Sequence, residues 1–188
     1  MNEETSDEAL MLRYQSGDAA AFDELYARHR SGLFRFIVRQ GRLGDHAEEL
    51  FQDVWMNLIK ARHTYRVEAQ FRTWLYTLAR NRVLDHFRSD GRAGAVMREV
   101  GEDEDIENVA GSRVAQPEVL ADAREQGEAI VKLLESLPAP QREAFLMYQE
   151  SGLAIEEIAK ATGVTFEAAK SRLRYAVAKL REGLQEYR

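Results

Sequence analysis

The stretch GLAIEEIAKATGVTFEAAKSRLR, residues 152–174, carries the clearest fold signal in the chain. It predicts a short helix, a tight turn and a second, basic helix. Gly163 stands where the first helix must end, because glycine tolerates a left-handed backbone. Thr165 follows as a plausible N-cap of the second helix, and the small Ala159 lets the two helices approach closely. The pattern indicates a helix-turn-helix.

The second helix of this motif is strongly basic. Glu167 is its one early acid, and the bases that follow are Lys170, Arg172, Arg174, Lys179 and Arg181. A helix of this charge after such a turn is suited to the major groove of DNA. The alternative is a pair of packed surface helices whose basic face is only solvated.

Composition limits the remaining possibilities. The chain has 188 residues, is 45% hydrophobic and contains no cysteine, so a disulfide framework, a thiol nucleophile and a cysteine-ligated metal are excluded. Its acidic N-terminus leads into no secretory apolar segment, and no apolar run approaches the ~20 residues that span a bilayer. We therefore expect an all-α protein, without membrane insertion, in the cytoplasm.

The net charge of −6 is unevenly distributed. Residues 91–127 carry a net −5, whereas residues 60–88 carry a local +5. Local patches rather than the total decide contact with nucleic acid, so the acidic total does not exclude DNA binding.

The chain divides into an N-terminal helical bundle (1–90), a linker (91–117) and a helix-turn-helix domain (118–188). The linker contains the acidic run EDED at 102–105 together with glycine, serine and proline, a composition typical of a flexible tether. An acidic linker could instead shield a basic surface.

Helical periodicity predicts four helices in the N-terminal part. Ser6 or Thr5 can cap the first helix, Asp18 the second and Asp45 the third. The third has a continuous apolar stripe, and the fourth, at roughly 69–88, turns Phe71, Trp74, Leu75, Leu78 and Ala79 inward. The stripe of the third comprises Ala47, Leu50, Phe51, Val54, Trp55, Leu58 and Ile59.

The polar faces of the third and fourth helices suggest binding surfaces. Opposite its stripe the third carries Glu48, Glu49, Gln52 and Asp53, which form either a solvated face or a docking surface for a basic partner. The fourth mixes aromatics with arginines, a combination that suits unstacked DNA.

Within the fourth helix, Asn81 and Asp85 lie one turn apart and could read the edge of a flipped base. Asp85 could instead pair locally with Arg82 or Arg88. Trp74 could be a base platform, but its spacing favours a core position.

Nothing in the sequence indicates catalysis. The four histidines are scattered, and His46 with Glu49 is the only pair at a ligand-like spacing, which an exposed position at a helix start also explains. There is no nucleophile elbow, phosphate loop or paired-acid constellation. We expect no enzyme activity, no metal and no cofactor.

Taken together, the motifs resemble those of two-domain bacterial extracytoplasmic-function (ECF) sigma factors of RNA polymerase. They are GDAAAF (17–22), DHAEELFQDVW (45–55), FRTWLYTLARN (71–81), LP (137–138) and KSRL (170–173), and they cover nearly the whole chain in order and spacing. The resemblance implies a non-enzymatic subunit that directs RNA polymerase to promoters of a stress- or signal-responsive regulon and opens the strands.

The resemblance also implies roles for individual residues. Glu48, Glu49, Gln52 and Asp53 would dock on the clamp helices of the polymerase β′ subunit, and the second domain would meet the β flap. The minus-thirty-five element would be read by Thr165, Lys170, Ser171, Arg172 and Arg174. The minus-ten element would be melted and read by Arg66, Arg72, Trp74, Arg80, Asn81, Arg82, Asp85, His86 and Arg88.

The chain departs from the family pattern at Ala154, where a Ser or Thr helix cap is common, so this helix start should be weaker. Control by a separate anti-sigma factor is the family expectation. The main alternative function is a free-standing helix-turn-helix regulator. Such regulators usually bind palindromes as dimers, whereas this chain has no coiled-coil heptad and its aromatic, basic helix has no use in that role.

Overall fold

The computed structural model describes residues 5–41, 43–89 and 123–186, and every regular element in those ranges is a helix, as the sequence predicts. The predicted linker, 91–117, lies entirely outside these residues. The N-terminal helices are α1 (Asp7–Gln15), α2 (Ala19–Val38), α3 (Ala47–Ala61) and α4 (Phe71–Ser89), with short 3-10 turns at Gly44–His46 and Arg62–Thr64. The C-terminal helices are α6 (Ala123–Ser136), α7 (Ala139–Ser151), α8 (Ile155–Thr162) and α9 (Phe166–Glu186).

Side-chain caps define the starts of α1 and α2. The Ser6 hydroxyl accepts from the backbone N–H of Ala9 at 3.2 Å, and the Asp18 carboxylate accepts from that of Ala20 at 3.1 Å, so both predicted caps are confirmed. The prediction for Asp45 is wrong. This residue lies inside a 3-10 turn that runs directly into α3, and no side chain caps that helix.

The predicted apolar stripe of α3 packs inward. Leu50, Val54 and Leu58 are essentially inaccessible, and Trp55 is buried against Tyr26, with ring centroids 4.9 Å apart. Phe51 is only partly buried at the edge of this aromatic cluster. Burial of large apolar side chains is the main stabilising contribution to such a bundle.

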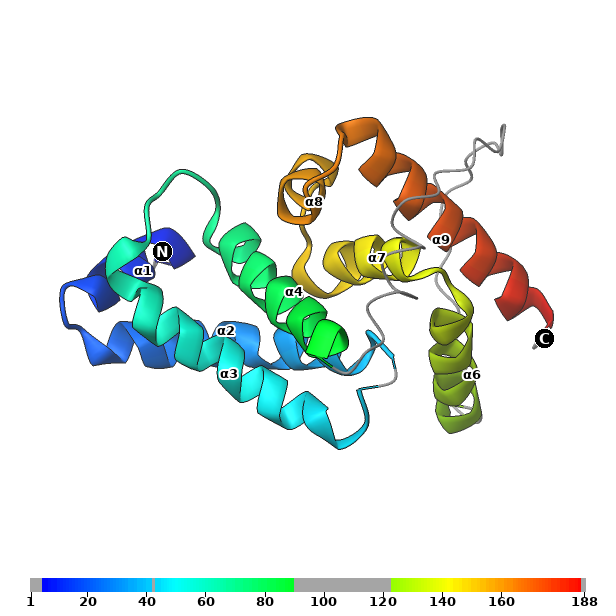
Figure 1. Ribbon diagram of the computed structural model, residues 1–188, viewed down its shortest axis with the longest axis horizontal. Coiled ribbons are helices and arrows are strands. Elements are labelled where there is room, and N and C mark those ends of the chain that lie inside the picture. Colours follow the sequence, from blue (N-terminus) through cyan, green and yellow to red (C-terminus); the bar gives the residue numbers. More distant parts are fainter. Residues whose placement is uncertain (1–4, 42, 90–122, 187–188) are drawn as a thin grey trace.

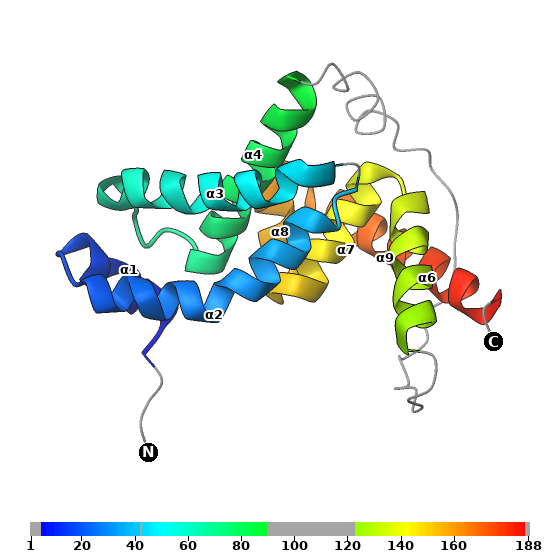
Figure 2. The ribbon, with the colours of Figure 1, turned by 90° about the horizontal axis from the view of Figure 1, so that it is seen from below.

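Helix α4 is buried on two sides. Phe71, Leu75 and Ala79 face the N-terminal core, as predicted. Tyr76 is also buried, because α7 and α8 of the C-terminal domain cover that side of α4. Figures 1 and 2 show α4 lying between the N-terminal helices and the α7–α8 pair. The two parts that the sequence divides therefore share one continuous hydrophobic cluster.

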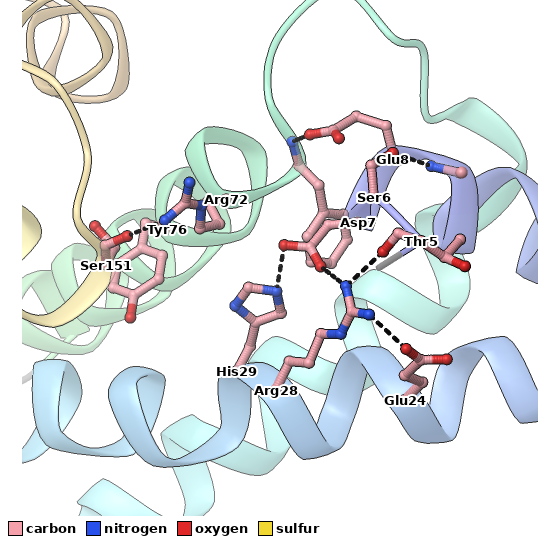
Figure 3. Close-up of polar contacts among 12 residues, drawn as sticks. Thr5, Ser6, Asp7, Glu8, Glu24, Arg28, His29, Arg72, Tyr76 and Ser151 are labelled. Carbon is pink, nitrogen blue, oxygen red and sulfur yellow. Dashed lines mark hydrogen bonds and ion pairs between the residues drawn. The ribbon is translucent and has the colours of Figure 1, made fainter. Parts of the chain in front are cut away.

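The N-terminal helix α1 is fastened to its neighbours by carboxylates (Figure 3). Asp7 accepts from the guanidinium of Arg28 at 2.9 Å and lies 2.8 Å from the ring nitrogen Nε2 of His29. The Glu8 carboxylate accepts from the backbone N–H of Phe71 at 2.8 Å and so satisfies the first turn of α4. Burial raises the pKa of Asp7, but the hydrogen bonds and charges of His29 and Arg28 outweigh burial and hold this pKa below its ordinary value.

Ala154 occupies the N-cap position of α8, where the sequence predicts a weaker helix start. Its backbone angles are extended (φ −68°, ψ 160°), but it has no side-chain acceptor. Glu157 compensates in part, because its carboxylate accepts from the backbone N–H of Ala154 at 2.8 Å. One half of a capping box is therefore present.

Replacing Ala154 with serine should complete that capping box. We expect Ala154→Ser to raise the free energy of unfolding by about 1 kcal/mol, because a hydroxyl would accept from an N–H in the first turn of α8. Denaturant titration measures the change. Ala27→Ser, in the exposed middle of α2, is the matched control and should be slightly destabilising, since serine is a poorer helix former than alanine. Equal effects of the two substitutions would contradict the capping argument.

Asp7 should contribute to acid sensitivity. Its pKa is lower in the folded chain than in the unfolded chain, so the unfolded chain binds more protons. The stabilisation by Asp7 is therefore complete at neutral pH and is lost as the pH falls below about 4. Asp7→Asn should lower the free energy of unfolding at pH 7 and flatten its dependence on pH in the acid range. Urea titrations across that range measure both effects, and the exposed Asp23→Asn is the control. A wild-type acid slope in Asp7→Asn would refute the argument.

Candidate nucleic-acid interface

The predicted docking face on α3 is accessible. Glu48, Glu49 and Gln52 are exposed on the side of the helix opposite its buried stripe. Asp53 is only half-buried and is already paired, because its carboxylate accepts from the Arg82 guanidinium of α4 at 2.8 Å. The exposed part of this face is therefore Glu48, Glu49 and Gln52, while Asp53 links α3 to α4.

The C-terminal half of α4 presents its predicted residues to solvent. Asn81, Asp85 and Arg88 are exposed, and Arg88 donates to Asp85 at 2.9 Å. The local pairing considered for Asp85 is thus present. Arg66 is exposed in the loop before α4. His86, by contrast, is buried, and its ring packs at a tilt against that of His46, with centroids 4.8 Å apart, so it holds α4 against the turn before α3.

Trp74 lies on the boundary between the core and the surface. Its ring packs against Tyr65 at 5.0 Å and Phe71 at 6.1 Å, and it is only partly buried. A core role is consistent with these contacts, and the exposed remainder of the ring adjoins the loop that carries Arg66.

Two arginines predicted to contact DNA instead face the C-terminal domain. Arg72 donates to the backbone carbonyl of Ser151 at 2.9 Å (Figure 3), and Arg80 forms an ion pair with Glu143 at 3.0 Å. The side chains of Arg80 and Glu143 are mostly buried. Arg80 therefore does not lie on the exposed surface that its predicted minus-ten role requires, whereas Arg72 is only partly buried and commits one N–H group to Ser151.

A polar hollow of about 820 Å³ adjoins Arg72 on its other side. It lies between the N-terminal residues, α2 and the loop before α4, and its charged lining includes Asp7, Arg28, Glu68 and Arg72. The lining contains both acids and bases, so the hollow has no strong preference for anions. Within the described part of the chain, no group of three or more potential ligands could hold a metal ion.

The helix-turn-helix forms as predicted. Gly163 ends α8 with a left-handed backbone (φ +73°), and the Thr165 hydroxyl accepts from the backbone N–H of Ala168 at 3.2 Å. Lys170 and Arg174 are exposed on α9, and Ser171 is half-buried. Thr165 is exposed as well, so its side chain both caps α9 and lies on the surface.

Arg172 does not join this surface. Only 8% of it is exposed, and its guanidinium lies close enough to Glu143 to interact electrostatically. Ala169, Leu173, Ala176 and Leu180 are the apolar residues of the same buried face of α9. The spacing of these residues places Arg172 on the core side of the helix. This position corrects the expectation of an exposed Arg172, and the periodicity of α9 could have revealed it.

Glu143 is the residue that sequence reasoning missed. Its carboxylate lies between Arg80 of one domain and Arg172 of the other, and Arg142 also lies nearby. Burial raises the pKa of Glu143 above its ordinary value, although the three arginines oppose this shift. A lone glutamate in an amphipathic helix gives no sequence signal for such a position, because its partners come from distant segments.

None of the helices described is both long enough and apolar enough to cross a membrane.

The described residues offer two exposed charged surfaces, one acidic on α3 and one basic on α9. The exposed end of α4 adds a mixed polar surface.

Comparison with known proteins gives these surfaces a context. Residues 25–93 match the family model described as Sigma-70 region 2, and residues 127–180 match Sigma-70, region 4. The ECF RNA polymerase sigma factor SigM of Mycobacterium tuberculosis is 31% identical over 94% of this chain and 84% of its own length. The RNA polymerase sigma factor CarQ of Myxococcus xanthus is 30% identical over 94% of this chain and 96% of its own length.

Solved structures agree with the fold. The sigma factor RpoE of Bartonella quintana, solved with the anti-sigma factor NepR, has a TM-score of 0.67 and 29% identity over 89% of this chain and 98% of its own. CnrH, solved with the cytosolic domain of CnrY, has a TM-score of 0.69 over 97% of this chain and 99% of its own, but at 21% identity it supports the fold alone.

These matches span both helical parts, in the order that the motifs predict. Sigma factors are non-enzymatic subunits that bind RNA polymerase and recognise promoters, so the expectation of a chain without catalytic activity is confirmed. The chain belongs to the ECF RNA polymerase sigma factors.

Proposed function

We propose that this sigma factor contacts the clamp helices of the polymerase β′ subunit through the exposed acidic face of α3, made of Glu48, Glu49 and Gln52. The observation that supports this proposal is the exposure of three polar residues opposite an apolar stripe whose Leu50, Val54 and Leu58 are fully buried. An exposed acidic face suits a basic partner and steers its approach. Asp53 contributes indirectly, because its ion pair with Arg82 positions α4 relative to α3.

The promoter contacts follow from what each helix leaves exposed. Asn81, Asp85, Arg88 and Arg66 would meet the minus-ten element, with Trp74 supporting the loop that carries Arg66. Lys170, Ser171, Arg174 and Thr165 on α9 would meet the minus-thirty-five element in the major groove. Contact between the second domain and the β flap is part of the same proposal.

Regulation by a separate anti-sigma factor also belongs to this proposal. The sigma factor RpoE of Bartonella quintana, which has a similar fold, was solved in complex with the anti-sigma factor NepR. A cytoplasmic location and a stress- or signal-responsive regulon are consistent with such control. A free-standing regulator is not favoured, because both sigma regions are present and in order.

Charge reversal on α3 tests the docking surface. Glu48→Lys with Glu49→Lys should weaken binding to core polymerase at least several-fold, because both carboxylates are exposed and would repel a basic partner. A titration with labelled core polymerase measures the affinity, and circular dichroism checks that helicity is unchanged. Asp53 is left intact, since changing it would also break the ion pair with Arg82.

The control for this experiment is Asp23→Lys with Glu156→Lys, a double charge reversal at exposed positions of α2 and α8. It matches the change in net charge but lies off the α3 face, so it should bind core polymerase like the wild type. Equal weakening by the two double variants would remove the α3 face from the proposal. Failure of the wild-type chain to co-elute with core polymerase would reject the function itself.

Arg172 and Arg174 of α9 should behave differently. On a promoter selected by run-off transcription, Arg174→Ala should cost about 1–3 kcal/mol of upstream-element recognition if Arg174 contacts a guanine edge. Its effect should vanish when the upstream element is scrambled. Arg172→Ala should instead lower the thermal stability and reduce transcription from both promoters alike, because Arg172 is buried beside Glu143. Lys160→Ala, at an exposed position of α8, is the neutral control. A selective upstream defect in Arg172→Ala would contradict this division.

A further inference from the structure

An aromatic side chain is exposed at the start of α9, the second helix of the helix-turn-helix. Phe166 is the first residue of this helix, and 39% of it is accessible to solvent. Among the described residues, it belongs neither to the hydrophobic core nor to the half-buried side chains packed against that core. Single exposed apolar residues are common on protein surfaces, so the meaning of Phe166 depends on where it lies on α9.

The start of α9 does not require an aromatic residue. The Thr165 hydroxyl already caps the helix, because it accepts from the backbone N–H of Ala168 at 3.2 Å. The acidic Glu167 in the first turn interacts favourably with the helix dipole. Phenylalanine is a weaker helix former than alanine or leucine. Neither capping nor helix propensity therefore explains the ring at this position.

Phe166 shares one face of α9 with bases of the proposed DNA surface. Lys170 and Arg174 follow it at intervals of four residues, which places the three side chains along one side of the helix. The ammonium nitrogen of Lys170 lies 5.8 Å from the centre of the Phe166 ring, within the range of a cation–π interaction. Both bases are exposed. A single exposed stripe thus carries an apolar ring at its N-terminal end and two cations behind it.

The position of the ring along α9 is the one that meets base edges in DNA complexes. In helix-turn-helix proteins the N-terminal residues of the second helix contact bases in the major groove. Phosphates are instead contacted by cations and hydrogen-bond donors, and a phenyl ring is neither. Insertion of this end of α9 into the major groove therefore brings Phe166 against bases.

Thymine is the base that offers such a ring an apolar surface in the major groove. It presents its 5-methyl group there, whereas the other three bases present hydrogen-bond donors and acceptors. A phenyl ring packed over those polar groups would leave them without partners, which costs free energy. Packing on a methyl group instead removes apolar surface of both molecules from water.

We propose that Phe166 is a specificity-determining residue for the upstream promoter element, where its ring packs on the 5-methyl group of one thymine. The proposal rests on the proposed reading of the minus-thirty-five element by α9. It adds an apolar contact to the polar and charged contacts assigned to that helix. The contact with Lys170 restrains the ring in the free chain, so less side-chain freedom is lost on binding.

Replacement of thymine by deoxyuridine removes this methyl group alone and tests the proposal directly. In a promoter selected by run-off transcription, each thymine of the upstream element is replaced in turn, on both strands. Competition binding then measures the affinity of the wild-type holoenzyme for each promoter. One replacement should lower the affinity about fourfold, the effect expected for one buried methyl-sized group.

Variants of Phe166 connect that methyl group to this side chain. The Phe166→Ala holoenzyme should bind the thymine promoter at least as weakly as the wild type binds the deoxyuridine promoter, and deoxyuridine should weaken it no further. Phe166→Leu retains an apolar surface and should retain part of the sensitivity. Leu184→Ala is the matched control, because it removes another exposed apolar side chain of α9, about five turns away. It should respond to deoxyuridine like the wild type.

Three results would overturn the proposal. The first is a wild-type holoenzyme that tolerates deoxyuridine at every position of the upstream element. The second is a Phe166→Ala holoenzyme that keeps the full sensitivity of the wild type. The third is weaker binding of Phe166→Ala to core polymerase with unchanged sensitivity to deoxyuridine, which would assign the ring to a protein contact.

A scrambled upstream element separates this proposal from the proposed function. If scrambling does not lower the affinity of the wild-type holoenzyme, the proposed role of α9 fails, and the role of Phe166 fails with it. If scrambling lowers the affinity but no thymine depends on its methyl group, only the proposal for Phe166 fails.

Discussion

The double burial of α4 is the constraint on which the rest of this structure depends. One side of the helix completes the N-terminal core through Phe71, Leu75 and Ala79, and the other side packs on α7 and α8 around Tyr76. A helix covered on both sides cannot present its whole circumference to a ligand. The polar residues at its C-terminal end, Asn81 and Asp85, therefore remain exposed while Arg72 and Arg80 turn toward the second domain.

Charge pairing between distant segments reshapes the electrostatic surface. Residues 60–88 have a local charge of +5 in the sequence. In the folded chain, however, Arg80 is paired with Glu143 of α7 and Arg82 with Asp53 of α3. The basic character of α4 is thus partly neutralised by acids that the segment itself does not contain. A count of charges along the sequence overestimates the field that a phosphate would meet, because the opposite charges of a close ion pair largely cancel at a distance.

The second helix of the helix-turn-helix, α9, also has some of its basic residues on the surface and others in the core. Residues of α9 spaced three or four apart share a face, so Ala169, Leu173 and Ala176 form a buried face and Lys170 and Arg174 lie on an exposed one. Arg172 falls on the buried face and meets Glu143. A basic helix is therefore not a uniform DNA-binding rod. Its geometry assigns each arginine either to the solvent or to the core.

The sequence by itself determined the features that depend on nearby residues. The helices, the caps at Ser6, Asp18 and Thr165, and the left-handed turn at Gly163 all follow from side chains within a few positions, where local hydrogen bonding and backbone sterics dominate. The exposed acidic face of α3 follows in the same way from helical periodicity, and the motifs identify the family. The N-cap predicted at Asp45 was wrong, because Asp45 lies inside a 3-10 turn that runs into α3.

Only the tertiary structure decided which polar side chains meet across the domains. Glu143 finds Arg80 and Arg172, Glu150 finds Arg35 and Arg39, and Gly32 admits the backbone of α7. These partners are separated by many residues along the chain, so no local pattern encodes their pairing. Their pairing depends on how two amphipathic surfaces align when both bury apolar area, and that alignment is a property of the packed domains rather than of any single segment.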